Sequence, residues 1–513
     1  MKRYFVSLFL IISLLPLASP AQAKRAVGRN AAVKERVTTK STPAQVPYEI
    51  PIVTKTLANG LEVIVLADSS VPLVTVELDV RNGSFTEPPE YNGLSHLFEH
   101  MFFKPNLAVR LSQCENTPAA NRLSTLYLSK CSEAIRLKPQ IGDLSYLKDA
   151  GQLGRYNGST REEVVNYYYT VTSPYLAAAI RQINDSVRFP MFDETEFAQE
   201  KQVVIGELDR HEANPYEALD LAMKAKLFYK YPTRKIPEGT RATVSAATTD
   251  QMRLIQSRYY VPNNAALVVT GDVKPEDVFQ LAEQIMGSWE RRKVDPFKEF
   301  PLVEHPPLPK SEGQVIEKSG EDSNNVIIEI GWQGPSIGKD DAATYAADVF
   351  SYIITQPDSR FQRNLVDSGL ATSVGFGYYT QRNVGPINLV MATTPEKAKA
   401  ALKAAYAEIA AFTSPTYFTD EELDAAKTIL ESNDLFEREK LSEYVHTLGF
   451  WWSSTGIDYF RGYHKHLRAT TRQDINNYLR TYVQNKPHVA LTMLAPASKS
   501  EANLTEQDLI GGK

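Results

Sequence analysis

Residues 93–104 read Gly-Leu-Ser-His-Leu-Phe-Glu-His-Met-Phe-Phe-Lys, and they decide how the rest of the chain is interpreted. Two histidines, His96 and His100, stand four positions apart in this mainly apolar stretch. In a helix both imidazoles would project from one face and could hold one zinc ion. Glu99 would then lie beside the metal, where a carboxylate can take a proton from a zinc-bound water. The stretch therefore predicts a helix with hydrolytic chemistry, and the alternative is a pair of buried, hydrogen-bonded core histidines.

The order His-x-x-Glu-His is that of the inverzincin motif, and the stretch resembles, almost position by position, the zinc helix of the pitrilysin family. That family includes insulysin and the mitochondrial processing peptidases. The resemblance implies a third zinc ligand on a later helix, and the matching run over residues 200–207 places it at Glu207. Glu200, seven residues earlier on the same helix face, would support the site from outside the ligand set. The alternative for Glu200 is a solvated charge on an amphipathic helix.

The N-terminal residues predict a secretory signal peptide over residues 1–23. Lys2 and Arg3 precede an apolar stretch over residues 4–17, and Ala21-Gln22-Ala23 is a small-x-small cleavage site. We therefore expect an exported protein, periplasmic in a bacterium, with no stable membrane insertion after cleavage. An uncleaved anchor is the alternative, although the apolar stretch is shorter than the roughly 20 residues that a membrane-spanning helix needs.

Composition indicates a globular protein of at least two domains, since the chain has 513 residues of which 43% are apolar and 23% are charged. Residues 24–46 are polar and lack periodicity, which predicts a flexible lead-in. The formal charge is -5, and no basic cluster follows residues 24–40. Nucleic acid is therefore not expected as a partner.

The chain has two cysteines, Cys114 and Cys131, and in an exported protein such a pair predicts a disulfide that contributes about 3 kcal/mol. A metal role for the two thiols is the alternative, but without nearby histidines they would make an incomplete site. Both lie in residues 105–150, which look like an insertion because the family usually brings its glutamate closer to the second histidine.

Strands are predicted on both sides of the insertion. The alternation of apolar residues between Val74 and Val80 predicts antiparallel strands with one buried face. Residues 154–160 resemble the strand beside the family's active site, whose edge pairs with an extended substrate. This resemblance makes Asn157 and Ser159 candidates for substrate binding, with Gly158 where relatives usually have alanine. The alternative is an ordinary turn that leads into a strand.

An internal repeat predicts a duplicated domain. The segment 247–251 leads to a strand over 265–270, and the similar segment 469–473 leads to a strand over 488–494. We therefore expect an α+β fold of two homologous domains, each an antiparallel sheet flanked by helices, arranged as a clamshell or half-chamber. The expected order is a zinc domain at 47–293, a Pro-rich linker at 294–313 with His305 in solvent, a non-catalytic domain at 314–498 and a tail at 499–513.

The two copies differ in their chemistry. Counting 226 residues on from Glu200 and Glu207 leads to Ala426 and Asn433, so the second copy is not expected to bind the same zinc. In the family the second half often contributes an arginine and a tyrosine that hold the substrate backbone. The matching positions here are Leu365 and Thr372, which suggests, by analogy with mitochondrial processing peptidase, a homologous second subunit.

These features together predict a zinc-dependent endopeptidase with one Zn²⁺ per chain. Its expected substrates are peptides or unfolded polypeptides, and it could be the catalytic subunit of a heterodimer. The alternative is a non-catalytic assembly or chaperone-like subunit whose zinc site is structural or idle. Glu99 separates the two hypotheses, because structural zinc does not need a neighbouring base.

Overall fold

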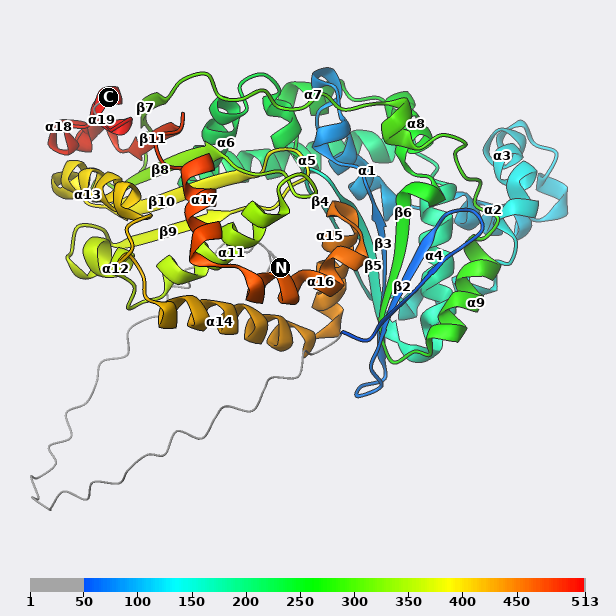
Figure 1. Cartoon of the computed structure of the whole chain (residues 1–513). Coiled ribbons are helices and arrows are strands. Elements are labelled where there is room, and N and C mark those ends of the chain that lie inside the picture. The colour runs from blue at the N-terminus through cyan, green and yellow to red at the C-terminus, as the bar shows by residue number, and fades with distance from the viewer. Residues whose placement is uncertain (1–49, 512–513) are drawn as a thin grey trace, which may run out of the picture. The chain divides into compact units, whose positions relative to one another are not determined.

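Figure 1 shows the computed structural model of the chain, which describes residues 50–511. The predicted signal peptide at 1–23 and the predicted lead-in at 24–46 lie outside the described residues. Within the described part, no helix is both long enough and apolar enough to span a membrane.

The first sheet has six strands in the order β1-β2-β6-β3-β5-β4. All neighbours are antiparallel except β2 and β6, which pair in parallel. The antiparallel sheet predicted from the sequence is therefore confirmed, with one parallel pair that the sequence did not predict, because β6 returns from far along the chain and inserts between β2 and β3. The strands are β1 (Ile52–Thr56), β2 (Glu62–Ala67), β3 (Leu73–Val80), β4 (Arg155–Thr160), β5 (Val165–Thr172) and β6 (Ala265–Gly271).

The second sheet repeats this topology with the order β7-β11-β8-β10-β9. Its only parallel pair among the described strands is β7 with β11, at the position of β2 with β6. The duplication predicted from the sequence is therefore visible in the strand order, and the α+β fold with two sheets is confirmed. The strands are β7 (Glu312–Glu317), β8 (Val326–Gln333), β9 (Ser373–Tyr378), β10 (Pro386–Thr393) and β11 (Val489–Leu494).

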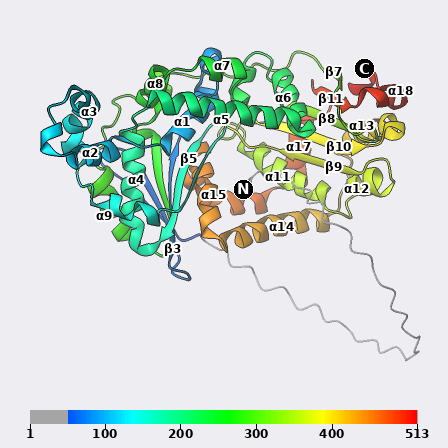
Figure 2. The same cartoon turned by 180° about the vertical axis from the view of Figure 1, so that it is seen from behind.

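Helices of the first half cover one face of the first sheet, where the apolar residues of β3 predicted to be buried lie in the core. Figure 2 shows α4 and α9 side by side over this sheet. Helices α1 and α5 pack against each other near the β4 edge. The helices of this half are α1 (Leu94–Phe102), α2 (Leu107–Glu115), α3 (Thr125–Ile141), α4 (Leu176–Arg188), α5 (Glu194–Ala213), α6 (Pro215–Leu227), α7 (Arg241–Ala246), α8 (Thr249–Tyr259), α9 (Pro275–Met286) and α10 (Pro296–Glu299).

A second core forms in the same way around the second sheet, with α11 against β9, α14 and α17. The helices of this half are α11 (Asp341–Thr355), α12 (Arg360–Gln362), α13 (Ala398–Ala411), α14 (Asp420–Arg438), α15 (Leu441–Ser454), α16 (Ile457–Ala469), α17 (Arg472–Tyr482), α18 (Lys499–Ala502) and α19 (Glu506–Leu509).

The two halves exchange one helix each. Helix α6 of the first half packs on β8 and β11 of the second sheet, and α15 of the second half packs on β3 and β6 of the first sheet. Met223 and Leu227 of α6 are buried against Val489 and Leu491 of β11. Each sheet therefore has one face covered by its own half and residues of the other face covered by the opposite half.

Polar contacts also join the halves where their two hairpin turns meet. The buried carboxylate of Glu163, between β4 and β5, accepts hydrogen bonds from the backbone N–H of Arg382 (2.7 Å) and Asn383 (2.9 Å), between β9 and β10. The buried Lys235 ammonium donates to the carbonyls of Asn383 (2.6 Å) and Val384 (2.9 Å). Charged groups from the first half thus satisfy backbone groups of the second.

The predicted linker over 294–313 is more structured than expected, since it contains α10 and the first residues of β7. His305 was expected in solvent, but it is 6% exposed. Its ring lies against Phe228 (4.9 Å between ring centroids) and Tyr231 (6.0 Å). Burial lowers the pKa of His305 to about 3, so the neutral imidazole behaves as an aromatic core residue, which a Pro-rich sequence does not reveal.

The segment 499–513 was expected to be a tail, but its described part folds against the second sheet. Helix α19 packs on β7, and Leu504 and Leu509 are buried in the second core. This segment is short and has few apolar residues with no clear periodicity, so the sequence alone does not predict the contact.

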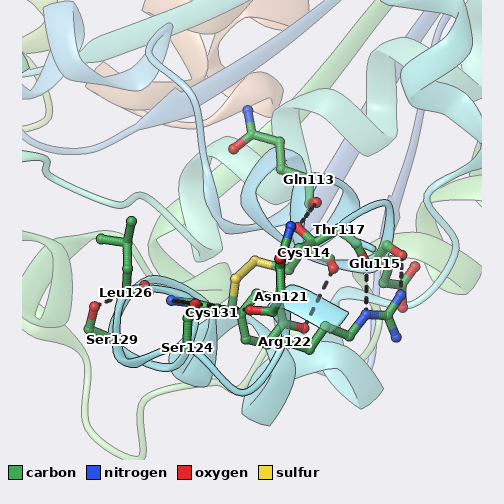
Figure 3. The surroundings of a disulfide bond; sticks show 11 residues. Gln113, Cys114, Glu115, Thr117, Asn121, Arg122, Ser124, Leu126, Ser129 and Cys131 are labelled. Atoms are coloured by element: carbon green, nitrogen blue, oxygen red, sulfur yellow. Dashed lines mark hydrogen bonds between the residues drawn. A yellow bond between two sulfur atoms is a disulfide. The ribbon is translucent and has the colours of Figure 1, made fainter. Parts of the chain in front are cut away.

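The predicted insertion forms a helical hairpin of α2 and α3 with a small core of its own. A disulfide joins Cys114 and Cys131, whose Cα atoms are 5.9 Å apart (Figure 3). Arg122 closes the connecting loop by donating to the carbonyls of Thr117 (2.8 Å) and Glu115 (2.7 Å). The insertion is therefore ordered by local contacts and a covalent link.

Replacing Gly449 with alanine is expected to destabilise the protein, because helix α15 approaches the first sheet closely at this residue. A Cβ atom there would lie 2.3 Å and 2.4 Å from the carboxylate oxygens of Asp79, which is 1% exposed. We expect the free energy of unfolding in urea to fall by about 1–3 kcal/mol. Gly462→Ala in α16 is the matched control, since its new Cβ would meet nothing nearer than 3.4 Å. Equal effects of the two substitutions would contradict the prediction.

Candidate metal centre

Helix α1 is oriented by its apolar face. Leu97, Phe98 and Met101 are buried in the first core, and Phe98 stacks on Tyr260 with ring centroids 4.0 Å apart. This packing directs the remaining face, with His96 and His100, towards α5.

The N-terminus of α1 is held by a carboxylate that the sequence does not predict. Gly93 has φ +94° and no side chain to cap the helix, and Glu87 instead accepts hydrogen bonds from the N–H of Gly93 (2.8 Å) and Ser95 (2.6 Å). Burial raises the pKa of Glu87 to about 7, although these hydrogen bonds lower it. No motif marks this contact, because Glu87 lies outside the helix and reaches it through a turn.

The predicted metal ligands lie together. Ligand atoms of His96, His100 and Glu207 are all within 4.8 Å of one another. One oxygen of Glu207 lies 3.5 Å from His96 Nε2 and 3.6 Å from His100 Nε2. Tetrahedral zinc with bonds of roughly 2.1 Å separates its ligand atoms by about 3.4 Å, so these residues fit the metal. Among the described residues, no other group of three such side chains has this geometry.

Glu200 lies behind His100 rather than in solvent, with its side chain 12% exposed. Its carboxylate is 3.0 Å from His100 Nδ1 and 2.5 Å from the ammonium of Lys104. Burial raises the pKa of Glu200, but the hydrogen bonds from Lys104 and His100 outweigh this effect and lower it below its usual value. An ionised Glu200 accepts the Nδ1 proton of His100, which leaves Nε2 of that ring directed at the metal position.

Glu99 lies against the edge strand β4. The hydroxyl of Thr160 donates to Glu99 Oε2 at 2.8 Å. A Cβ atom on Gly158 would lie 2.8 Å from Glu99 Cγ, so the glycine that departs from the family pattern gives the carboxylate room beside the strand. Glu99, which belongs to helix α1, is therefore held against β4, the edge strand of the first sheet.

The side chains of Asn157 and Ser159, the candidates for substrate binding, are on the opposite face of β4. Alternation along the strand separates them from Gly158 and Thr160, which face Glu99. The hydroxyl of Ser159 donates to Asn166 Oδ1 at 2.8 Å, and its N–H donates to the same oxygen at 2.9 Å. The structure thus does not bring these two side chains to the metal ligands.

At the matching positions, the second half has neither the glutamates of the metal centre nor the arginine and tyrosine of the family. Ala426 is buried, and Asn433 donates to the hydroxyl of Tyr352 at 3.2 Å. Leu365 is fully buried in the second core, and the Thr372 hydroxyl donates to the carbonyl of Ala392 at 3.1 Å. Leu365 and Thr372 are therefore engaged within their own domain.

Two protein-family models match the chain. The model described as Insulinase (Peptidase family M16) matches residues 62–115 and 144–240, which include the whole candidate metal centre. The model described as Peptidase M16 inactive domain matches residues 246–430. This chain belongs to the M16 family, that of pitrilysin and insulysin. The gap between the two M16 segments, residues 116–143, lies within the predicted insertion.

Relatives in the M16 family include proteases of very different length. An uncharacterized zinc protease of Rickettsia felis is 24% identical over 396 residues, which are 77% of this chain and 85% of that protein. Human insulin-degrading enzyme is 27% identical over 257 residues, which are 49% of this chain and 22% of that enzyme. The structure of the periplasmic protease PqqL from Escherichia coli matches with TM-score 0.65 at 16% identity, covering 91% of this chain and 50% of PqqL. The aligned region thus spans half or less of the latter two proteins.

Glu200→Gln is expected to weaken zinc binding by about 10- to 100-fold, because a neutral amide holds the His100 Nδ1 proton less strongly. Glu212→Gln, an exposed position on the same helix, is the control and should bind zinc like the unmodified protein. The measurement is competition for zinc with a chelator of known affinity. Equal zinc affinity of both variants would show that Glu200 does not support the metal ligands.

Proposed function

We propose that this chain is a zinc-dependent endopeptidase that hydrolyses peptides or unfolded polypeptides. The observation that carries the proposal is the position of Glu99, between three residues that fit zinc and the open edge of a sheet. His96, His100 and Glu207 would hold one Zn²⁺ per chain. The names of relatives, zinc protease and insulin-degrading enzyme, support the same reaction.

The chain's own residues supply the rest of the chemistry. When bound, zinc supplies Lewis-acid activation of water and of the scissile carbonyl. Glu99 would take a proton from the attacking water and return it to the leaving amine nitrogen. Thr160 would keep the carboxylate in place through its hydrogen bond to Oε2.

The expected class of substrate follows from β4. This strand ends the first sheet, so its outer edge has no neighbouring strand among the described residues. An extended peptide could add to that edge by backbone hydrogen bonds, as in β-augmentation. A folded protein rarely offers such a strand, which favours peptides and unfolded chains.

The alternative is a non-catalytic assembly or chaperone-like subunit. The match of residues 246–430 to the model described as Peptidase M16 inactive domain is the observation that favours it. A base held beside the metal position favours catalysis, since structural zinc needs none.

The predicted signal peptide, together with the likeness to the fold of periplasmic PqqL, supports export to the periplasm.

Glu99→Gln is expected to lower the rate of peptide hydrolysis by about 10² to 10⁴ while zinc content stays the same, because the base is lost and no ligand is. The assay is cleavage of a quenched fluorescent peptide, with zinc measured by atomic absorption. Glu90→Gln, an exposed glutamate before α1, is the control and should keep full activity. Near-native turnover by Glu99→Gln would rule out this mechanism.

A homologous second subunit is proposed to complete the substrate site, since Leu365 and Thr372 are buried or engaged elsewhere and the aligned region spans half of PqqL. Adding a homologue with the arginine and tyrosine pair is expected to raise kcat/KM at least about tenfold, equal to some 1.4 kcal/mol of transition-state binding. The measurement is a titration of the chain with candidate homologues, with mass followed by light scattering. Full activity of a monomer or homodimer, unchanged by any homologue, would contradict the prediction.

A further inference from the structure

One residue of the second half contacts β3 and β5 of the first sheet, and β5 is the strand next to the edge strand β4. His446, on α15, is hydrogen-bonded through Nδ1 to the buried carboxylate of Glu77 on β3. Its ring lies 4.5 Å from the ring of Tyr168, between centroids, and Nδ1 lies 3.4 Å from Asn166 Nδ2. Burial lowers the pKa of His446, but Glu77 outweighs this effect and raises it. The ring therefore keeps its Nδ1 proton and donates it to Glu77.

The contact continues to β4 through Asn166. The amide nitrogen of Asn166 faces His446, and its amide oxygen accepts both the N–H and the hydroxyl of Ser159. Asn166 is 8% exposed. Because the imidazole fills the space beside the amide nitrogen, the oxygen stays directed at Ser159. Glu77, His446, Asn166 and Ser159 thus lie in a row from the buried sheet face to the open edge strand, with hydrogen bonds at the two ends and a packing contact between the His446 ring and the Asn166 amide.

The duplicated second sheet contains the same framework. Residues 74–80 and 326–332 align one to one, which places Glu329 at the position of Glu77. Asn388 pairs across its ladder with the residue two after Glu329, as Asn166 does with the residue two after Glu77. The carboxylate and the amide are therefore common to both copies.

The two residues that complete the chain to the edge strand are not common to both copies. His446 is the sixth residue of α15, and the sixth residue of α6 is Asp220. Ser159 pairs with Asn166, and the residue that pairs with Asn388 is Gly377. Helix docking in the second copy therefore works without imidazole or hydroxyl, and of the two sheets only the first, in the half that holds the metal ligands, has both beside its asparagine.

We propose that His446 is a positioning residue, which with Glu77 fixes Asn166 and thereby holds Ser159 and the edge strand β4 in the position that receives the substrate. Helix α15 of the second half would in this way contribute to peptide binding in the first half without touching the peptide. This inference rests on the proposed endopeptidase function only in assigning the substrate to β4.

The first test measures hydrogen–deuterium exchange of the β4 amides, residues 155–160, in the full chain, and it requires no activity. In His446→Gln the new amide can still donate to Glu77, so the buried carboxylate keeps a partner. We expect exchange of β4 to speed up at least about threefold. Asp220→Asn, at the matching position of α6, is the control and should leave β4 exchange unchanged.

The second test is a double-mutant cycle in peptide hydrolysis. Ser159→Ala and His446→Gln should each raise KM about three- to tenfold, while kcat changes by no more than about twofold. The KM of the double variant should be no higher than that of the single variant with the higher KM, because both substitutions break the same connection. Ser159→Ala combined with Asp220→Asn should show independent effects. A loss of helix docking alone would not produce this pattern.

Three results would overturn the proposal: unchanged β4 exchange in His446→Gln, the same acceleration in Asp220→Asn, or multiplicative effects of Ser159→Ala and His446→Gln on KM. If His446→Gln does not fold, Ser159→Ala keeps the Glu77–His446 pair and must by itself accelerate β4 exchange. If the unmodified protein cleaves no peptide, the endopeptidase function fails, and the exchange experiment still decides whether His446 positions β4.

Discussion

The exchange of α6 and α15 between the two halves is the constraint on which the rest of the structure depends. Helix α15 of the second half covers residues of the first sheet, including the buried Glu77. Helix α6 of the first half covers residues of the second sheet, including the buried Glu329. Burial raises the pKa of Glu329 well above its usual value, and Asp220 on α6 adds to the effect. Separating the halves would expose both an apolar cluster and these carboxylates, so the two domains are expected to fold as one unit.

This constraint explains how the copies diverged. Docking of a helix on a sheet requires complementary shape. In the first copy the small residue is on the helix, where Gly449 of α15 faces Asp79, and in the second copy it is on the sheet, where Gly331 faces Met223 of α6. Framework positions are therefore held by packing in both halves. Positions at the sheet edge and on α1 are free of this requirement, and among the described residues the three side chains that fit a metal ion occur in the first half alone.

The candidate site depends on three elements that meet beside β4. Helix α1 is aimed by its apolar face and capped by Glu87, α5 brings Glu207 and Glu200, and the strand holds Glu99 through Thr160. The metal ligands, Glu99 and Thr160 all lie on helices or a strand rather than on loops. A preformed arrangement of this kind lowers the cost of ordering the reacting groups, which is what a hydrolytic centre requires.

The sequence by itself determined the metal helix, from the spacing of His96 and His100, and the duplication, from segments that recur in the second half. It also determined the pairing of Cys114 and Cys131, because the chain has no other cysteine. Even the distant Glu207 followed from sequence, through a resemblance to known relatives. The parallel pairing of β2 with β6, the burial of His305, the docking of α19 and the cap by Glu87 were decided only by the tertiary structure. Each depends on which distant segment covers a residue, and a single sequence does not encode that locally. The same reason kept the surroundings of Ser159 out of reach of the sequence. Its strand was predictable, but the residue that binds its hydroxyl, Asn166, comes from β5, and His446 behind Asn166 comes from the other half of the chain.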